Sequence, residues 1–241
     1  MLKARFGHDF DARIARLLPF LFHPRVHPNA LSVVGLAVSV AGAAAFAGGR
    51  FRAGALIVLL GGVFDLVDGV VARRQGRVTT FGGFLDSSLD RVVDMALLLG
   101  PMMYYAREGA AALAWLAALA LVATVLVSYT KARAESVLGR FEGGLLERAE
   151  RVVILVAGGL FGAMPLALGV VALGSTITAG QRIAIAHRRM SELDAEREAA
   201  EAAADQAALS AAPDDAAPSA APDDAAPSAA HNDEETANAA G

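Results

Sequence analysis

Five aspartates lie within the stretch GGVFDLVDGVVARRQGRVTTFGGFLDSSLDRVVD, at residues 61–94. They are Asp65, Asp68, Asp86, Asp90 and Asp94. Most of their neighbours are apolar, and an ionised carboxylate that leaves water without a partner carries a large free-energy cost. Carboxylate oxygens are the ligands that Mg²⁺, Mn²⁺ and Ca²⁺ prefer. The stretch therefore predicts a site for divalent cations.

The spacing of these aspartates predicts that they share a face of two neighbouring helices. The first two are three residues apart and the last three are four apart, so each set projects from one side of a helix. The short segment 73–82 joins the two helices as an antiparallel pair, which brings the acidic faces together. For a single member such as Asp65 or Asp94, a salt bridge with Arg91 is the alternative interpretation.

The elements that carry these residues have the composition of membrane spans. The chain has 241 residues, of which 55% are hydrophobic, and its mean hydropathy is +0.47. Segment 10–22, FDARIARLLPFLF, has apolar residues at helical spacing and predicts an amphipathic helix on the membrane surface. Six segments are apolar and long enough to cross a bilayer: 30–49, 52–72, 83–105, 110–132, 150–166 and 167–187. We expect an all-α integral membrane protein with six transmembrane helices and an N-terminal interfacial helix.

The distribution of Lys and Arg predicts the orientation of these spans. With the N-terminus inside, the external loops hold only Arg50, Arg52 and Arg107, and the internal segments hold 17 Lys or Arg residues. This asymmetry follows the positive-inside rule. We expect a multi-pass protein of the inner membrane with both termini and the aspartates on the cytoplasmic side.

The C-terminal part of the chain differs from the rest in charge. Residues 1–189 carry 20 Lys or Arg and 12 Asp or Glu, whereas residues 190–241 carry one Arg and 13 Asp or Glu. The sequence AAPDDAAPS at 211–219 is repeated at 220–228. We expect a membrane domain over 1–189, an exposed helical extension over 190–210 and a disordered acidic tail over 211–241. The chain has no cysteine, and we expect no nucleic-acid partner.

The aspartates belong to a longer motif. DLVDGVVAR, eight further residues and then GGFLDSSLD fit the pattern D-x2-D-G-x2-A-R-x8-G-x3-D-x3-D at every fixed position. This pattern resembles the signature of the CDP-alcohol phosphatidyltransferase family, and the resemblance covers about residues 8–189. It implies six spans, an interfacial N-terminal helix, a homodimer and a lipid substrate, CDP-diacylglycerol.

The resemblance also implies roles for single residues. The positions that hold two divalent ions, Mg²⁺ or Mn²⁺, are matched by Asp65, Asp68, Asp86 and Asp90, and the last of these matches the proposed general base. The positions at the CDP-lipid are matched by Pro28, Asn29, Gly69, Ala72, Arg73 and Gly82. For the first two, a simple turn that begins a helix is the alternative.

Basic residues near the same end of the spans suit a phosphorylated acceptor. They occur in SYTKARAE at 128–135, GGLLERAER at 143–151 and QRIAIAHRR at 181–189, and the candidate acceptor residues are Ser128, Lys131, Arg133, Arg148, Arg151 and Arg182. The pattern resembles the phosphatidylinositol phosphate synthase branch, which implies transfer of the phosphatidyl group to inositol 1-phosphate with release of CMP. Glycerol 3-phosphate and free inositol are alternative acceptors, and the positive-inside rule alone also places arginines here.

Two other classes of protein are alternatives to an enzyme. Intramembrane aspartates also occur in ion-coupled transporters, but there they lie near the bilayer midplane and often in two related halves. The aspartates here cluster at one end of two adjacent spans, and 1–189 shows no internal repeat. A membrane scaffold leaves the aspartates without a role.

Overall fold

The computed structural model of the chain describes residues 27–211, which are α-helical apart from short connections. The helices are α2 (Pro28–Ala47), α3 (Phe51–Arg74), α4 (Thr80–Arg107), α5 (Ala111–Leu138), α6 (Arg148–Phe161) and α7 (Met164–Ala211). The amphipathic helix expected at 10–22 and the tail from residue 212 onward lie outside the described residues. The all-α prediction is confirmed for the part of the chain that the structure describes.

Four helices, α2, α3, α5 and α7, are long and apolar enough to cross a membrane. Helix α4 has 28 residues, but its segment 86–94 carries four charged side chains, those of Asp86, Asp90, Arg91 and Asp94. Helix α6 has only 14 residues, a rise of about 21 Å against a hydrocarbon core about 30 Å thick. Length and apolar composition therefore identify four of the six expected spans.

The junction between the last two helices differs from the sequence expectation at 166/167. Helix α6 ends at Phe161 because Gly162 takes a left-handed conformation, with φ 72°, which glycine adopts without steric cost. Pro165 lies in the first turn of α7, where a missing N–H costs nothing. The second helix of this pair therefore begins at Met164 and continues past residue 187.

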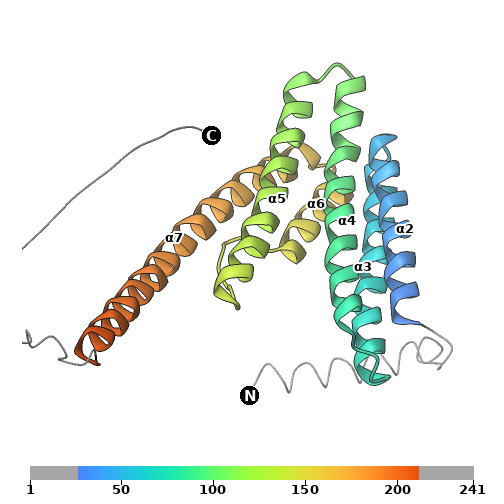
Figure 1. Cartoon of the computed structure of the whole chain (residues 1–241). Helices are drawn as coiled ribbons and strands as arrows, with labels where there is room; N and C mark the ends of the chain where they lie inside the picture. The colour runs from blue at the N-terminus through green and yellow to red at the C-terminus, as the bar shows by residue number, and fades with distance from the viewer. Residues whose placement is uncertain (1–26, 212–241) are drawn as a thin grey trace, which may run out of the picture. The chain divides into compact units, whose positions relative to one another are not determined.

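Glycines allow α2 and α3 to pack closely. A Cβ atom on Gly54 would lie 2.8 Å from the carbonyl oxygen of Gly42, and one on Gly61 would lie 3.2 Å from that of Gly35. Gly35 and Gly42 of α2 are seven residues apart, and so are Gly54 and Gly61 of α3. Each pair therefore falls on one face of its helix. Small residues at such contacts bring helix backbones together in membrane proteins. The antiparallel pair is seen in Figure 1, where α2 also lies along α4.

The core is apolar and takes residues from all six helices, α2 to α7. Its fully buried side chains include Phe46, Val58, Leu97, Leu168 and Val171. Figure 1 shows the α4–α5 connection at the top and the α3–α4 connection at the opposite end. The first turns of α4 therefore lie beside the last turns of α3, as the expected antiparallel pair requires.

Helix α7 holds the loop that precedes α6. Arg182 donates from Nε to the carbonyl of Gly143, at 2.8 Å, and from Nη1 to that of Val127, at 2.7 Å. The backbone N–H of Leu146 donates to the hydroxyl of Thr178, at 2.9 Å. These bonds fix the path of the loop and so the place where α6 begins.

Of the described residues, those from 27 to 194 form one compact unit, and the rest of α7 belongs to a second unit that begins at Ala195. Every residue from 195 to 207 is exposed to solvent.

Candidate functional site

Three carboxylates from α3 and α4 converge. Asp65, Asp68 and Asp86 can each place one oxygen within 4.8 Å of the other two. Asp68 is buried, with 6% of its surface exposed, and the Ser32 hydroxyl donates a hydrogen bond to its Oδ2. Convergent carboxylate oxygens at this separation fit the coordination of a hard divalent cation.

Asp90 lies outside this group and is held by an arginine. Arg148, the first residue of α6, places Nη2 at 2.8 Å from Asp90 Oδ1 and Nη1 at 3.1 Å from Asp65 Oδ2. Its Nε lies 3.4 Å from Oδ1 of Asp94. One guanidinium therefore neutralises carboxylates of both acidic helices, and it occupies the side of the site where Asp90 and Asp65 face each other.

One turn after Arg148 on α6, Arg151 forms a buried ion pair with Asp94. Arg151 Nη2 is 3.1 Å from Asp94 Oδ2, and each of these side chains is only 4% exposed. Arg151 also donates from Nη1 to the carbonyl of Leu146, at 3.2 Å. The sequence placed Asp94 on the acidic face of its helix, with a salt bridge to Arg91 as the alternative; in the structure its partners are Arg148 and Arg151.

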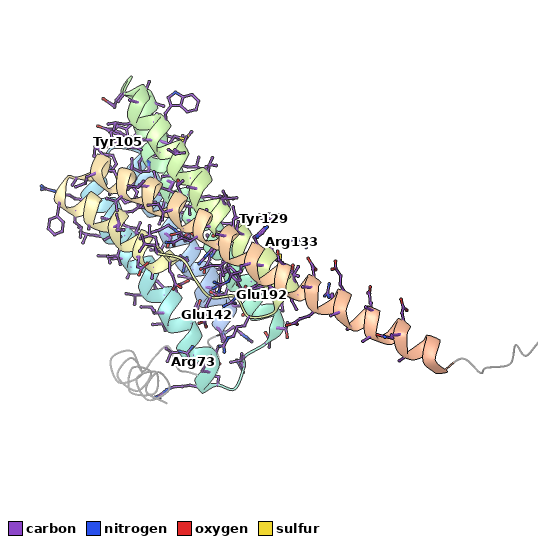
Figure 2. All side chains as sticks on the ribbon, turned by 90° about the vertical axis from the view of Figure 1, so that its left-hand side faces the viewer. Arg73, Tyr105, Tyr129, Arg133, Glu142 and Glu192 are labelled. Carbon is purple, nitrogen blue, oxygen red and sulfur yellow. The ribbon has the colours of Figure 1, made fainter. Side chains whose placement is uncertain are left out.

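All six residues predicted to lie at the CDP-lipid line one cavity of 270 Å³. This polar cavity is bounded by the start of α2, the end of α3 and the start of α4, and its walls also include Asp68 and Asp86. In Figure 2, Arg73 lies at the end of the bundle opposite Tyr105. The residues predicted for the CDP-lipid are Pro28, Asn29, Gly69, Ala72, Arg73 and Gly82.

A glycine keeps this polar cavity open. A Cβ atom on Gly82 would lie 3.0 Å from Oγ1 of Thr79 and 3.5 Å from Oδ1 of Asn29. Thr79 is the N-cap of α4 and accepts a hydrogen bond from the Gly82 N–H. The sequence prediction missed Thr79 and Ser32, which both line the cavity; Ser32 follows Pro28 by one helical turn and so faces the same side.

An apolar groove of 290 Å³ begins at the carboxylates and runs between α2, α3, α4 and α6. At its charged end lie Asp65, Asp86, Asp90 and Arg148, and the rest of its wall is mainly aliphatic, including Leu36, Val58, Leu59, Val63 and Leu66. Ser32 and Asp86 line both this groove and the polar cavity. The two spaces therefore meet at the carboxylates.

A third cavity, of 480 Å³, lies between α4 and α5. Ser128 and Lys131 of the predicted acceptor set line it, together with Ser87, Arg91 and Asp94. Arg91 is within 3.9 Å of Asp90 and is an acceptor candidate that the sequence prediction did not include. The sequence feature that could have indicated Arg91 is its position directly after Asp90, the last aspartate of the motif.

The structure divides the rest of the predicted acceptor set. Arg148 and Arg151 lie on α6, and both contact Asp94, which lines the α4–α5 cavity. Arg182 is buried and donates to two backbone carbonyls. Arg133 is exposed and donates to Ser136, and Figure 2 shows it next to Tyr129 on α5.

Comparison with known proteins agrees with the motif and the geometry. The family model for CDP-alcohol phosphatidyltransferase matches residues 25–180. A phosphatidylinositol phosphate synthase of Streptomyces avermitilis is 40% identical over 207 residues, which are 79% of this chain and 85% of that protein. An archaetidylinositol phosphate synthase of Methanothermobacter thermautotrophicus is 40% identical over 132 residues, 55% of this chain and 65% of that protein.

Solved structures show the same fold. The phosphatidylinositol phosphate synthase of Mycobacterium tuberculosis with CDP-DAG bound has a TM-score of 0.65 and 33% identity, covering 73% of this chain and 92% of that one. The same enzyme in complex with manganese and citrate has a TM-score of 0.63 and 33% identity, covering 73% and 88%. These matches confirm the family predicted from the aspartate motif. The chain belongs to the CDP-alcohol phosphatidyltransferase family and is a phosphatidyltransferase.

Proposed function

We propose that this enzyme transfers the phosphatidyl group of CDP-diacylglycerol to a hydroxyl of inositol 1-phosphate, releasing CMP. The observation that carries this proposal is the meeting of the polar cavity and the apolar groove at the carboxylates Asp65, Asp68 and Asp86. A CDP-lipid has a polar head, a diphosphate and two acyl chains, and this arrangement matches that order. The names of relatives at 40% identity support the same substrate and acceptor.

The donor would lie across both spaces. Its cytidine diphosphate would occupy the polar cavity, where Gly82 leaves room and Arg73 supplies positive charge. Its acyl chains would enter the apolar groove, where burial of hydrocarbon favours binding. The scissile phosphodiester would then lie at the carboxylates.

The carboxylates suit two divalent ions, Mg²⁺ or Mn²⁺, held by Asp65, Asp68, Asp86 and Asp90. Such ions, when bound, neutralise the diphosphate and stabilise the charge that develops on departing CMP. Asp90 would accept the proton of the acceptor hydroxyl as its oxygen attacks the phosphorus next to diacylglycerol. Arg148 holds Oδ1 of Asp90 at 2.8 Å, whereas the nearest cation to Oδ2 among the described residues is Arg91, at 3.9 Å, so Oδ2 is the oxygen better placed to accept the proton.

The phosphate of the acceptor would bind on the α4–α5 side. Lys131 and Ser128 line the cavity there, and Arg148 and Arg151 approach it through Asp94. Charge-assisted hydrogen bonds to a phosphate are about twice as strong as neutral ones. Arg91 and Lys131 supply the positive charge of this cavity wall, which also carries Asp94 and Glu135. A phosphate would bind to the two basic groups, which favours inositol 1-phosphate over free inositol.

The membrane topology is part of this proposal. We propose six transmembrane helices, an interfacial helix at 10–22 and a homodimer in the inner membrane. Helix α4 would cross beside the four more apolar helices, and the short α6 would cross where the bilayer is locally thinner. The arginines at the end of α3 contrast with the single one at the end of α4, Arg107, which supports a cytoplasmic site. The membrane domain would span 1–189, followed by the extension 190–210 and the acidic tail 211–241.

An acceptor panel tests the function. Purified protein with CDP-diacylglycerol and Mg²⁺ should release CMP with inositol 1-phosphate and give much less with free inositol or glycerol 3-phosphate, scored by the lipid product. Product from glycerol 3-phosphate alone would reject the acceptor and keep the reaction class. Absence of CMP release with every acceptor would reject the proposed reaction.

A further inference from the structure

Asp94 is the one aspartate of the five-member cluster that the family motif does not include. It lies one helical turn beyond Asp90 on α4, and 5% of its surface is exposed. Its Oδ1 is 3.4 Å from Nε of Arg148 and its Oδ2 is 3.1 Å from Nη2 of Arg151. One buried carboxylate therefore contacts both arginines at the start of α6.

This carboxylate reduces the repulsion between the two arginines. They are three residues apart, so they share a face of α6, and like charges at this spacing repel each other. Asp94 offers one oxygen to each and so cancels part of that repulsion in a buried site. The Nε groups of both Arg148 and Arg151 are buried and have no hydrogen-bond partner among the described residues.

Asp94 and Arg148 line different spaces, one proposed for the acceptor and the other for the donor. Arg148 reaches the donor side, where it lines the apolar groove, whereas Asp94 lines the α4–α5 cavity with Ser128 and Lys131. A change at Asp94 thus reaches the proposed acceptor side first. The polar cavity proposed for the nucleotide does not include it.

We infer that Asp94 is a positioning residue for the acceptor: it anchors Arg148 and Arg151 directly behind the part of the α4–α5 cavity wall that it forms, so that their positive charge lies next to the place proposed for the acceptor's phosphate. This inference rests on the proposed function. Asp94 lines the cavity proposed for the acceptor, but a carboxylate repels a phosphate, so it would act through the two guanidinium groups. Loss of its charge should weaken acceptor binding and leave donor binding intact.

The test is a comparison of kinetic constants for Asp94→Asn and the unaltered enzyme. Asn keeps the size of the side chain and removes its charge. We expect the KM for inositol 1-phosphate to rise on the order of tenfold or more, since charged hydrogen bonds to the phosphate lose their geometry. The KM for CDP-diacylglycerol should change by less than about twofold. Asp94→Glu, which keeps the charge at a shifted position, should recover part of the loss.

The matched control is Glu108→Gln, the same chemical change at the exposed C-cap of α4, which should alter neither constant. Equal acceptor KM values for Asp94→Asn and the unaltered enzyme would overturn the inference. So would equal rises in both KM values, or a raised metal requirement, which would make Asp94 a structural residue or a ligand.

Two further arms keep the result interpretable. If Asp94→Asn does not give folded protein by size-exclusion chromatography, Asp94→Glu decides: a raised acceptor KM with an unaltered donor KM supports the inference, and two unaltered values overturn it. If the unaltered enzyme prefers glycerol 3-phosphate, the proposed acceptor fails, and the same KM comparison made with that acceptor still tests Asp94.

Discussion

At the scale of residues, the site is a balance between carboxylates and one guanidinium. Arg148 contacts Asp65, Asp90 and Asp94, so it already supplies the positive charge that a cation would otherwise bring to the first two. Removing one partner of a buried charge network leaves the others uncompensated, which costs more than a surface ion pair contributes. Arg148 should therefore compete with divalent ions for Asp65 and Asp90.

The variant Arg148→Gln tests this competition. We expect it to bind Mn²⁺ more tightly, by about tenfold, because about 1.4 kcal/mol of competing interaction is lost at the two aspartates. Binding is measured by titration calorimetry or electron paramagnetic resonance without substrates. Arg133→Gln, on an exposed arginine that contacts Ser136, is the control and should not change Mn²⁺ affinity. Weaker binding by Arg148→Gln would contradict the competition.

Asp90 and Asp65 should differ in their mutational effects. Asp90→Asn keeps the side-chain volume but cannot accept a proton, so turnover should fall by about 100-fold or more while Mn²⁺ binding is largely kept.

Asp65→Ala removes a member of the three-carboxylate group, so the Mg²⁺ concentration for half-maximal activity should rise. Near-normal turnover by Asp90→Asn would remove it as the base, and an unchanged metal titration would exclude Asp65 as a ligand.

At the scale of elements, the close contact of α2 and α3 places the site. These helices bring Ser32 to Asp68 and form one wall of both the groove and the polar cavity. The contact depends on glycines whose backbones nearly touch, because any side chain there would separate the helices. The geometry of the carboxylates should therefore respond to changes that lie far from them in sequence.

Gly54→Ala is the corresponding test. A Cβ atom at this position would lie 2.5 Å from Cδ1 of Phe46 and 2.8 Å from the carbonyl of Gly42, so we expect a loss of about 1–3 kcal/mol of stability. The melting temperature in detergent, followed by size-exclusion chromatography, measures it. Gly169→Ala on α7 meets no atom within 4 Å and should leave stability unchanged or slightly raised. Equal melting temperatures for both variants would show that the contact tolerates a methyl group.

At the scale of the whole molecule, the site belongs to the unit that ends at Asp194. The residues from 195 to 207 are exposed, and the segment beyond is rich in Ala, Pro and Asp, which cannot build a core. Deletion of residues 199–241 should leave membrane insertion and specific activity within about twofold of the full chain. A truncated protein that inserts but has no activity would show that the tail takes part in catalysis.

The sequence determined the chemistry of this protein because its signals are local. A gapless aspartate motif names the family, and the spacing of three and four residues places the carboxylates on helix faces. The six residues expected at the CDP-lipid come from three separate helices, yet they line one cavity. That agreement arises because a short connection leaves an antiparallel pair almost no other arrangement.

Only the tertiary structure decided which charges meet. Arg148 and Asp65 are separated by 83 residues along the chain, and their contact depends on where the α5–α6 loop is held by α7. The sequence grouped Arg133 and Arg182 with Arg148, but packing turned one to solvent and bound the other to backbone carbonyls. Asp94 likewise gained two arginine partners that no local pattern indicates. Long-range pairing depends on the packing of whole helices, and a single sequence carries only a weak record of it.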